Sequence, residues 1–199
     1  WGDDQDAPTL LVSELENMGR RSLAFSADLS QPTTPTELLD QIEAKLGSVS
    51  VLVNNATYSV NGNYQQLDAL ALDAHYAVNM RGTFLLSVEF ARRFRAGTGG
   101  RIINLTSGQS LGPMPDELAY AATKGAVEAF TVSLAAGVAK LGITVNAVDP
   151  GPTDTGWMNP ELKDQLRSRF PSGRIGLPQD AAQLVAFLAS ESAEWVTGQ

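Results

Sequence analysis

Short apolar runs separated by long amphipathic stretches are the feature of this sequence that most restricts its fold. Val51–Val53, Arg101–Leu105 and Ile143–Val148 have the composition of buried strands, and Ser22–Asp28 alternates like a further strand. The stretches between them are long enough for helices, and connections of that length join parallel strands by right-handed crossovers. The pattern predicts a single α/β domain, residues 1–199, built as a doubly wound parallel sheet.

Turn and cap signals set the bounds of the expected helices. These helices cover Leu10–Arg20, Pro35–Leu46, Leu70–Arg95, Leu118–Leu141, Asn159–Phe170 and Ala181–Ser190, the last one capped by Asp180. The cluster Gly97–Gly100 is expected to form a loop between a helix and a strand.

Composition removes several classes of function. The formal net charge of -8 argues against a nucleic-acid partner, because binding to phosphates needs clustered Lys and Arg. The absence of cysteine excludes disulfides, and a single histidine makes a zinc site improbable, so no metal is expected. No apolar run reaches about 18 residues, so no membrane span is expected. The acidic start Trp1–Asp4 lacks the features of a signal peptide, and a cytoplasmic location is the default.

Two residues on the expected helix Leu118–Leu141 have the spacing of a proton-transfer pair. Tyr120 and Lys124 are four residues apart and share a helix face. An ammonium group close to a phenol favours the phenolate and lowers the tyrosine pKa from its usual value of about 10. That is the tuning a general acid or base needs, although an incidental surface pair would have the same spacing.

Polar residues at strand ends and on one apolar helix stripe are further candidates. Ser107 follows a strand, where its hydroxyl would hold a substrate oxygen or only satisfy its own loop. Asn79 lies on an apolar stripe and is either an active-site amide or a structural amide that holds a neighbouring loop. Asn54–Thr57 ends a buried strand and is otherwise a turn signal.

Taken together, six segments resemble the motifs of one family in their order and spacing. They are Asn54-Asn55-Ala56, Asn79 within Tyr76–Asn79, Ser107, Tyr120-x-x-x-Lys124, Val145–Gly151 and Trp195–Gln199. The chain resembles the short-chain dehydrogenases/reductases, and particularly the 3-oxoacyl-carrier-protein-reductase-like members. The resemblance implies a Rossmann-type fold and an NAD(P)-dependent oxidoreductase that interconverts a carbonyl and an alcohol.

The resemblance also implies roles for particular residues. Tyr120 would exchange a proton with the substrate oxygen, and Ser107 would hold that oxygen. Lys124 would lower the pKa of Tyr120 and bind the nicotinamide ribose, and Asn79 would anchor a water. The cofactor, NADP or NAD, would be contacted by Tyr120 and Lys124 and by Asp28, Leu29, Asn55, Ala56, Pro150, Gly151, Thr153 and Thr155. Residues 152–174 would form the substrate loop, with Trp157–Arg174 as its mobile part.

Two features depart from the family pattern. Thr57 stands where the family usually has glycine, which permits closer backbone approach. No segment matches the family's glycine-rich turn, which cradles the cofactor pyrophosphate at a helix N-terminus. We therefore expect a domain that is incomplete at both ends, in which strand 22–28 has no partner and an edge of the sheet is bare.

Two other classes of function are considered. Gly108–Gly112 fits the G-x-S-x-G pattern of hydrolases, but Pro113 follows it and the only histidine, His75, precedes Ser110. His75 itself is expected to be an exposed helical residue. The second alternative is a non-catalytic relative of the same fold, which the missing glycine-rich turn favours and the catalytic set opposes.

The expected partners are a small carbonyl or alcohol substrate and further copies of the chain. Helices Leu70–Arg95 and Leu118–Leu141 resemble the pair that forms subunit interfaces in this family. Small residues on the second helix would allow close helix approach there, or would pack on the subunit's own sheet; they are Ala126, Ala129, Ala135, Ala136 and Gly137. A dimer or tetramer is expected.

Overall fold

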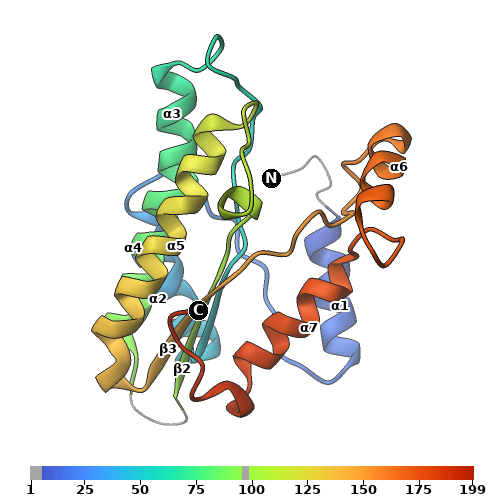
Figure 1. Cartoon of the computed structure of the whole chain (residues 1–199). Coiled ribbons are helices and arrows are strands. Elements are labelled where there is room, and N and C mark those ends of the chain that lie inside the picture. The colour runs from blue at the N-terminus through green and yellow to red at the C-terminus, as the bar shows by residue number, and fades with distance from the viewer. Residues whose placement is uncertain (1–5, 96–98) are drawn as a thin grey trace.

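The computed structural model describes residues 6–95 and 99–199 as a parallel sheet with helices on both faces (Figure 1). The strands are β1 (Val51–Asn54), β2 (Gly100–Leu105) and β3 (Ile143–Val148), hydrogen-bonded in the order β1-β2-β3. Both pairings are parallel, which confirms the predicted sheet. The expectations for residues 1–4, and for positions 97 and 98 of the glycine-rich loop, fall outside the described residues.

The helices follow the predicted order with small shifts of their bounds. They are α1 (Ala7–Asn17), α2 (Thr34–Leu46), α3 (Ala69–His75), α4 (Thr83–Arg93), α5 (Leu118–Val138), α6 (Pro160–Arg169) and α7 (Pro178–Ala189). Shorter helical turns are η2 (Gly108–Ser110), η3 (Ala139–Leu141) and η4 (Glu191–Ala193). Within the part of the chain that the structure describes, no helix combines the length and apolar character needed to cross a bilayer.

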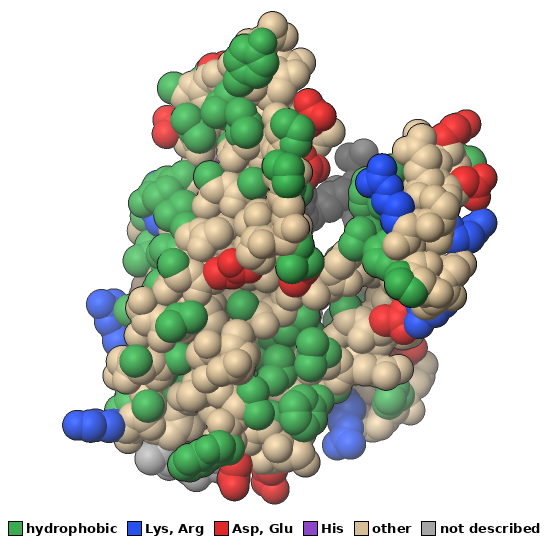
Figure 2. Space-filling view, in the orientation of Figure 1, with side chains coloured by type: hydrophobic (Ala, Val, Ile, Leu, Met, Phe, Trp, Pro, Cys, Tyr) green, Lys and Arg blue, Asp and Glu red, His purple; other side chains and the backbone are tan. Residues whose placement is uncertain are grey.

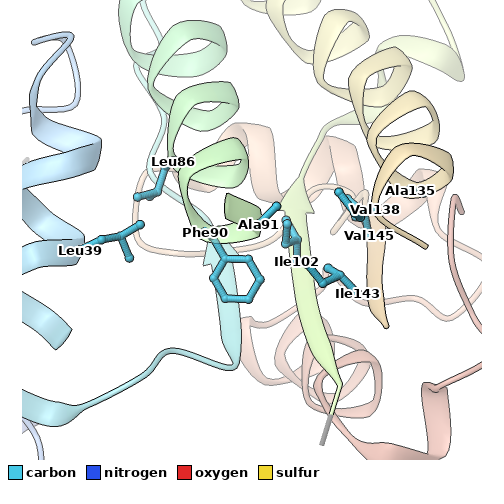
Figure 3. Close-up of a cluster of buried hydrophobic side chains, with 9 residues drawn as sticks. All are labelled: Leu39, Leu86, Phe90, Ala91, Ile102, Ala135, Val138, Ile143 and Val145. Atoms are coloured by element: carbon cyan, nitrogen blue, oxygen red, sulfur yellow. The ribbon is translucent and has the colours of Figure 1, made fainter. Parts of the chain in front are cut away.

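Alternating strand residues build a separate apolar layer on each face of the sheet. Ile102 of β2 packs with Leu39 of α2, Phe90 of α4 and Val138 of α5, as Figure 3 shows. Its neighbour Ile103 points to the opposite face, into the cluster that contains Leu188 of α7. Because successive strand side chains alternate between faces, one apolar run supplies both layers.

The prediction of a strand at Ser22–Asp28 is wrong, because these residues have no strand conformation in the structure. A strand is held by hydrogen bonds to a neighbour, and no described strand pairs with this segment. Alternation of apolar and polar residues is therefore not enough by itself to predict a strand. At the outer strand β3, the backbone N–H of Ala147 donates to the carbonyl of Gln199 over 2.7 Å, so the last residues run beside β3.

Two further expectations about helices need correction. The stretch predicted as one helix, Leu70–Arg95, is interrupted by η1 (Tyr76–Gly82), a π-helical segment between α3 and α4. Asp180 is not the cap residue of α7, since the helix begins at Pro178 after the N-cap Leu177. Its carboxylate instead accepts the backbone N–H of Leu177 over 2.8 Å, which completes the capping pattern from inside the helix.

A chain of buried side-chain hydrogen bonds crosses the sheet between α4 and α5. The amide of Asn54 donates to the hydroxyl of Ser87 over 2.9 Å and to Oδ1 of Asn104 over 2.8 Å. Asn104 in turn donates to the Thr131 hydroxyl over 2.8 Å. Asn54 of β1 and Asn104 of β2 are partners in the strand register, so the amide hydrogen bond forms only when the two strands are paired in this register.

Some of the small residues of α5 pack on the sheet of their own subunit, and others lie on the outer face of the helix, where a subunit interface was expected. Ala135 is buried in the core of its own sheet. Ala129, Ala136 and Gly137 are exposed on the outer side of the helix. The interface expected for this face stays a prediction.

Candidate active site

The carboxyl ends of the three strands bring the predicted polar residues to one edge of the sheet. Asn54 ends β1, Ser107 follows β2 by two residues, and Pro150 follows β3 by two residues. Parallel strands end at a common edge, which is where α/β proteins of this kind bind ligands. The N-terminal turn of α5, which begins at Leu118, lies beside the same edge and adds Tyr120.

The side chain of Ser107 lowers the pKa of the Tyr120 phenol, so the two hydroxyl groups lie near each other. Ser107 has an extended backbone and precedes the short turn η2, which faces α5. Tyr120 lies in the first turn of α5 and is partly buried. The two hydroxyls therefore lie where a single substrate oxygen would contact both.

The pKa of the Tyr120 phenol is raised, mainly because burial disfavours the charged phenolate. The hydrogen bond from Ser107 opposes this shift, and the negative charges of Glu117 and Asp149 add to it. The expectation that Lys124 lowers this pKa is wrong for the structure as it stands. Tyr120 is accordingly protonated at neutral pH, which suits it to donate a proton to a carbonyl oxygen.

Lys124 is buried under Tyr120 with one identified hydrogen-bond acceptor. Its Nζ donates to the carbonyl of Leu105 over 2.7 Å and lies 5.5 Å from the centroid of the Tyr120 ring. Burial lowers the pKa of Lys124 to about 8. An ammonium group has three donors, so two remain for a ligand at the strand edge.

The buried ammonium predicts a rise in stability at alkaline pH. Below the folded-state pKa of about 8, Lys124 is charged in both states and the cost of burying the charge is complete. Between about 8 and the unfolded value of 10.5, the unfolded chain binds more protons, so the free energy of unfolding rises with pH. This shift corresponds to roughly 3 kcal/mol.

Substituting Lys124→Met should remove that increment. We expect urea unfolding of the wild-type protein and the variant, measured near pH 7.5 and near pH 10, to show a rise only in the wild type. Every other titrating group is shared, so its contribution cancels in the difference between the two proteins. A difference that stays constant with pH would contradict the buried, proton-releasing lysine.

Asn79 lies in the π-helical segment η1, where it is buried and fully hydrogen-bonded. Its Oδ1 accepts the backbone N–H of Tyr58 over 2.7 Å and the hydroxyl of Thr57 over 3.0 Å. Its Nδ2 donates to the carbonyl of Tyr58 over 2.9 Å and to the Thr123 hydroxyl over 3.0 Å. The amide thus joins the loop after β1 to α5, one residue before Lys124. π-Helical turns are frequent at functional sites.

Thr57 and Thr123 are site residues whose contacts the sequence reasoning did not foresee. Thr57 stands where the family usually has glycine, and its hydroxyl donates to Asn79 a hydrogen bond that glycine could not form. Thr123 bonds to the carbonyl of Tyr120 over 2.8 Å and accepts from Asn79. Its position three residues after Tyr120 was the available signal, because such residues share a helix face.

His75 is buried, with 1% of its surface exposed, so the prediction of an exposed helical residue is wrong. Its Nε2 accepts the backbone N–H of Val60 over 3.2 Å, and its Nδ1 lies 2.7 Å from the carbonyl of Ala71. The ring of Tyr58 contacts the imidazole edge-on, with centroids 4.8 Å apart. The loop after β1 covers the histidine, and both ring nitrogens are occupied.

The residues expected to contact a cofactor lie in two groups. Asn55, Ala56, Pro150, Gly151, Thr153 and Thr155 follow β1 and β3 at the strand edge. Gly151 has a φ of +61°, and a Cβ at that position would meet no atom within 4 Å. Asp28 and Leu29 form a turn beside η1, where a Cβ on Gly82 would lie 2.9 Å from the Leu29 carbonyl oxygen. That close approach requires a glycine.

The predicted substrate loop contains helix α6 and is tied to the strand edge by short-range contacts. The indole N–H of Trp157 donates to the carbonyl of Thr153 over 3.1 Å, although Trp157 is 63% exposed. Lys163 of α6 pairs with Asp154 at 2.7 Å. Asp154 also accepts from the backbone of Gly156, and the two bonds lower its pKa. In Figure 2 a hollow separates the α6 arm from the body that carries α3 and α5.

The structure does not place Ser110 and His75 as the nucleophile and base of a serine hydrolase. Ser110 ends the short turn η2, not a strand, and its hydroxyl donates to Glu128 over 3.3 Å. Both ring nitrogens of His75 are engaged by the backbone of Ala71 and Val60. A nucleophilic serine needs an adjacent base, and the only histidine of the chain does not serve Ser110.

Comparison with known proteins gives concordant matches over the whole chain. A family model described as enoyl-(acyl carrier protein) reductase matches residues 3–199. The uncharacterized oxidoreductase YjdA of Bacillus subtilis is 55% identical over 201 residues, covering 100% of this chain and 80% of that protein. An NADPH-dependent aldehyde reductase-like protein of Arabidopsis thaliana is 37% identical over 94% of this chain and 72% of its own length.

Solved structures agree with the sequence matches. A short-chain dehydrogenase/reductase from Serratia marcescens superposes with a TM-score of 0.92 at 32% identity, covering 100% of this chain and 81% of that one. The match includes the sheet edge and the α5 helix that carry Ser107, Tyr120 and Lys124. Fold, motif order and sequence identity together show that the chain is an oxidoreductase that belongs to the short-chain dehydrogenase/reductase family.

Proposed function

We propose that this chain is the catalytic domain of an NAD(P)-dependent oxidoreductase that reduces a small-molecule carbonyl to an alcohol, or catalyses the reverse. The observation that carries the proposal is the placement of Tyr120 near Ser107 and over the buried ammonium of Lys124. The aldehyde reductase-like relative has a name consistent with the same chemistry.

Each residue of the set has a distinct task in this reaction. Ser107 donates a hydrogen bond to the substrate carbonyl oxygen and orients it toward Tyr120. A nicotinamide cofactor bound in its reduced form, NADPH or NADH, would supply the hydride to the carbonyl carbon. Tyr120 gives its phenolic proton to the oxygen as negative charge develops there.

The residues present fit the nicotinamide end of such a cofactor. Lys124 has two unused N–H donors in a buried position, which suit the hydroxyl groups of a ribose. Beyond β3, Gly151 offers open space beside its positive-φ backbone. We assign Asn55, Ala56, Pro150, Thr153 and Thr155 to the same surface, and Asp28 and Leu29 to the adenine end. Asn79 is a positioning residue, because it acts through the loop at Tyr58 and through Thr123.

The test is a carbonyl-substrate screen on the full-length protein with NADPH and NADH supplied separately. We expect oxidation of one or both reduced cofactors to depend on an added ketone, aldehyde or 3-oxo ester. A parallel titration that follows cofactor fluorescence measures binding without turnover. Binding without any carbonyl-dependent oxidation would favour the non-catalytic relative, and absence of both would remove the proposal.

A further inference from the structure

We propose that Arg81 and Gly82, the last two residues of the π-helical segment η1, are positioning residues for the adenine end of the cofactor, because they hold the turn Asp28–Ser30 in place. The inference rests on the proposed function, which assigns Asp28 and Leu29 to that end. Neither positioning residue touches the cofactor. Both act through the turn, whose Asp28 carboxylate accepts a hydrogen bond from the adenine amino group.

Asp28 presents a carboxylate that is exposed and already oriented. Its Oδ1 accepts the backbone N–H of Ser30 over 2.9 Å, and its Oδ2 accepts the side-chain amide of Gln31 over 3.2 Å. The hydrogen bonds from Ser30 and Gln31 lower the pKa of this carboxyl, so it is ionised at neutral pH. An ionised carboxylate only accepts hydrogen bonds and has several acceptor positions, so the partner that suits it on a purine is an amino group.

The turn rests on η1 through its last two carbonyl groups. The carbonyl of Ser30 accepts an N–H from the guanidinium of Arg81, 51 residues further along the chain. The carbonyl oxygen of Leu29 lies against Gly82, where an added Cβ would come within 2.9 Å of it and within 3.2 Å of the Leu29 Cβ. The place of the turn is therefore set by contacts with η1, at two adjacent residues.

The surroundings of Arg81 favour a positioning role over a stabilising one. Its Cζ lies 5.8 Å from the centroid of the Tyr76 ring, and it forms no ion pair with any described residue. Its Nε is buried and has no acceptor among residues 6–95 and 99–199. A buried donor without an acceptor destabilises a fold, so stability alone would favour an apolar side chain here. An unsatisfied group of this kind in a folded protein calls for another explanation, and the hydrogen bond to the turn supplies one.

The same segment also holds the reacting end of the site. Asn79, two residues before Arg81, bonds to the backbone of Tyr58 and to the Thr123 hydroxyl. Loss of the Arg81 contact frees the turn and leaves these Asn79 contacts in place. Affinity for the adenine end should therefore fall, while kcat at saturating cofactor should not.

The experiment measures the Kd of NADPH and NADH for the full-length protein by cofactor fluorescence, without turnover. We expect Arg81→Met and Gly82→Ala each to raise the Kd of the preferred cofactor by about tenfold, the scale of one hydrogen bond to a charged group. Arg81→Lys keeps a charged donor and should restore part of the affinity. Steady-state kinetics at saturating cofactor should give the wild-type kcat.

A cofactor analogue separates positioning from a general loss of structure. In the hypoxanthine analogues of NADPH and NADH, a ring carbonyl replaces the adenine amino group, so the Asp28 contact is already lost with the wild type. The wild type and both variants should therefore bind the analogue with similar Kd.

Matched substitutions control for the chemical change itself. Arg92→Met removes a guanidinium whose side chain is 70% exposed. Gly137→Ala adds a Cβ to a helical glycine that has no atom within 4 Å of that position. Both controls should keep the wild-type Kd for the cofactor and for its analogue.

The outcomes separate this inference from the function on which it rests. Wild-type Kd in both variants, an equal rise for cofactor and analogue, or a fall in kcat that matches the rise in Kd would overturn the inference and leave carbonyl reduction standing. The wild type gives a check that no variant's folding affects, since equal affinity for cofactor and analogue would also overturn it. A wild type that binds neither reduced cofactor would remove the proposed function, and the inference with it.

Discussion

Substituting Tyr120→Phe in the full-length protein is expected to lower kcat for carbonyl reduction by about 10²–10⁴-fold. Phenylalanine keeps the ring that packs over Lys124 and removes only the hydroxyl that lies near Ser107. The proton would then have to come from water, without an oriented donor. Steady-state kinetics with the substrate found in the screen measure the effect.

The matched control for this substitution is Tyr64→Phe. Tyr64 is 80% exposed, so it undergoes the same chemical change away from the strand edge. Its kcat should match that of the wild type, and both variants should bind reduced cofactor. Unchanged turnover in Tyr120→Phe would end the assignment of the proton donor.

The largest expected effect on stability is that of Phe90→Ala, which should lower the free energy of unfolding by about 3–5 kcal/mol. Phe90 of α4 is 2% exposed and packs in the cluster that contains Leu39 of α2 and Ile102 of β2 (Figure 3). Its ring also stacks on Phe94, with centroids 5.8 Å apart. Alanine leaves a cavity that the surrounding helices and strands fill only in part.

Urea unfolding monitored by circular dichroism measures this effect, with Phe187→Ala as the control. Phe187 of α7 is 44% exposed, so its removal opens no closed cavity and should cost much less. Similar losses in the two variants would mean that the cluster around Phe90 is not the centre of the folded core.

Strands were predictable where apolar and β-branched residues dominate a short run. Ile143–Val148 was predicted with the bounds that the structure has, because such a run fits only a strand covered on both faces. Ser22–Asp28 was predicted wrongly from alternation, a local property, whereas strand formation depends on a distant partner. Local pattern therefore indicates which residues can form a strand, and the neighbours decide whether they do.

The candidate site was predictable as a set of residues and less so as a set of contacts. The motif spacing indicated Ser107, Tyr120 and Lys124, and the structure brings these three together. The direction of the Tyr120 pKa shift was wrong, because burial is invisible in a motif. His75 was misplaced for a related reason, since the loop that covers it returns from Tyr58 and Val60, fifteen or more residues away.

The buried amide chain through Asn54 and Asn104 has a consequence for how accurately the sheet assembles. If β1 slipped by one residue against β2, Val53 or Asn55 would stand opposite Asn104. The hydrogen bond between the side chains of Asn54 and Asn104 would then be broken in an apolar layer. Leaving such groups unsatisfied costs about 1–3 kcal/mol each. A misaligned sheet is thus penalised by two unsatisfied amides in addition to its misplaced apolar side chains.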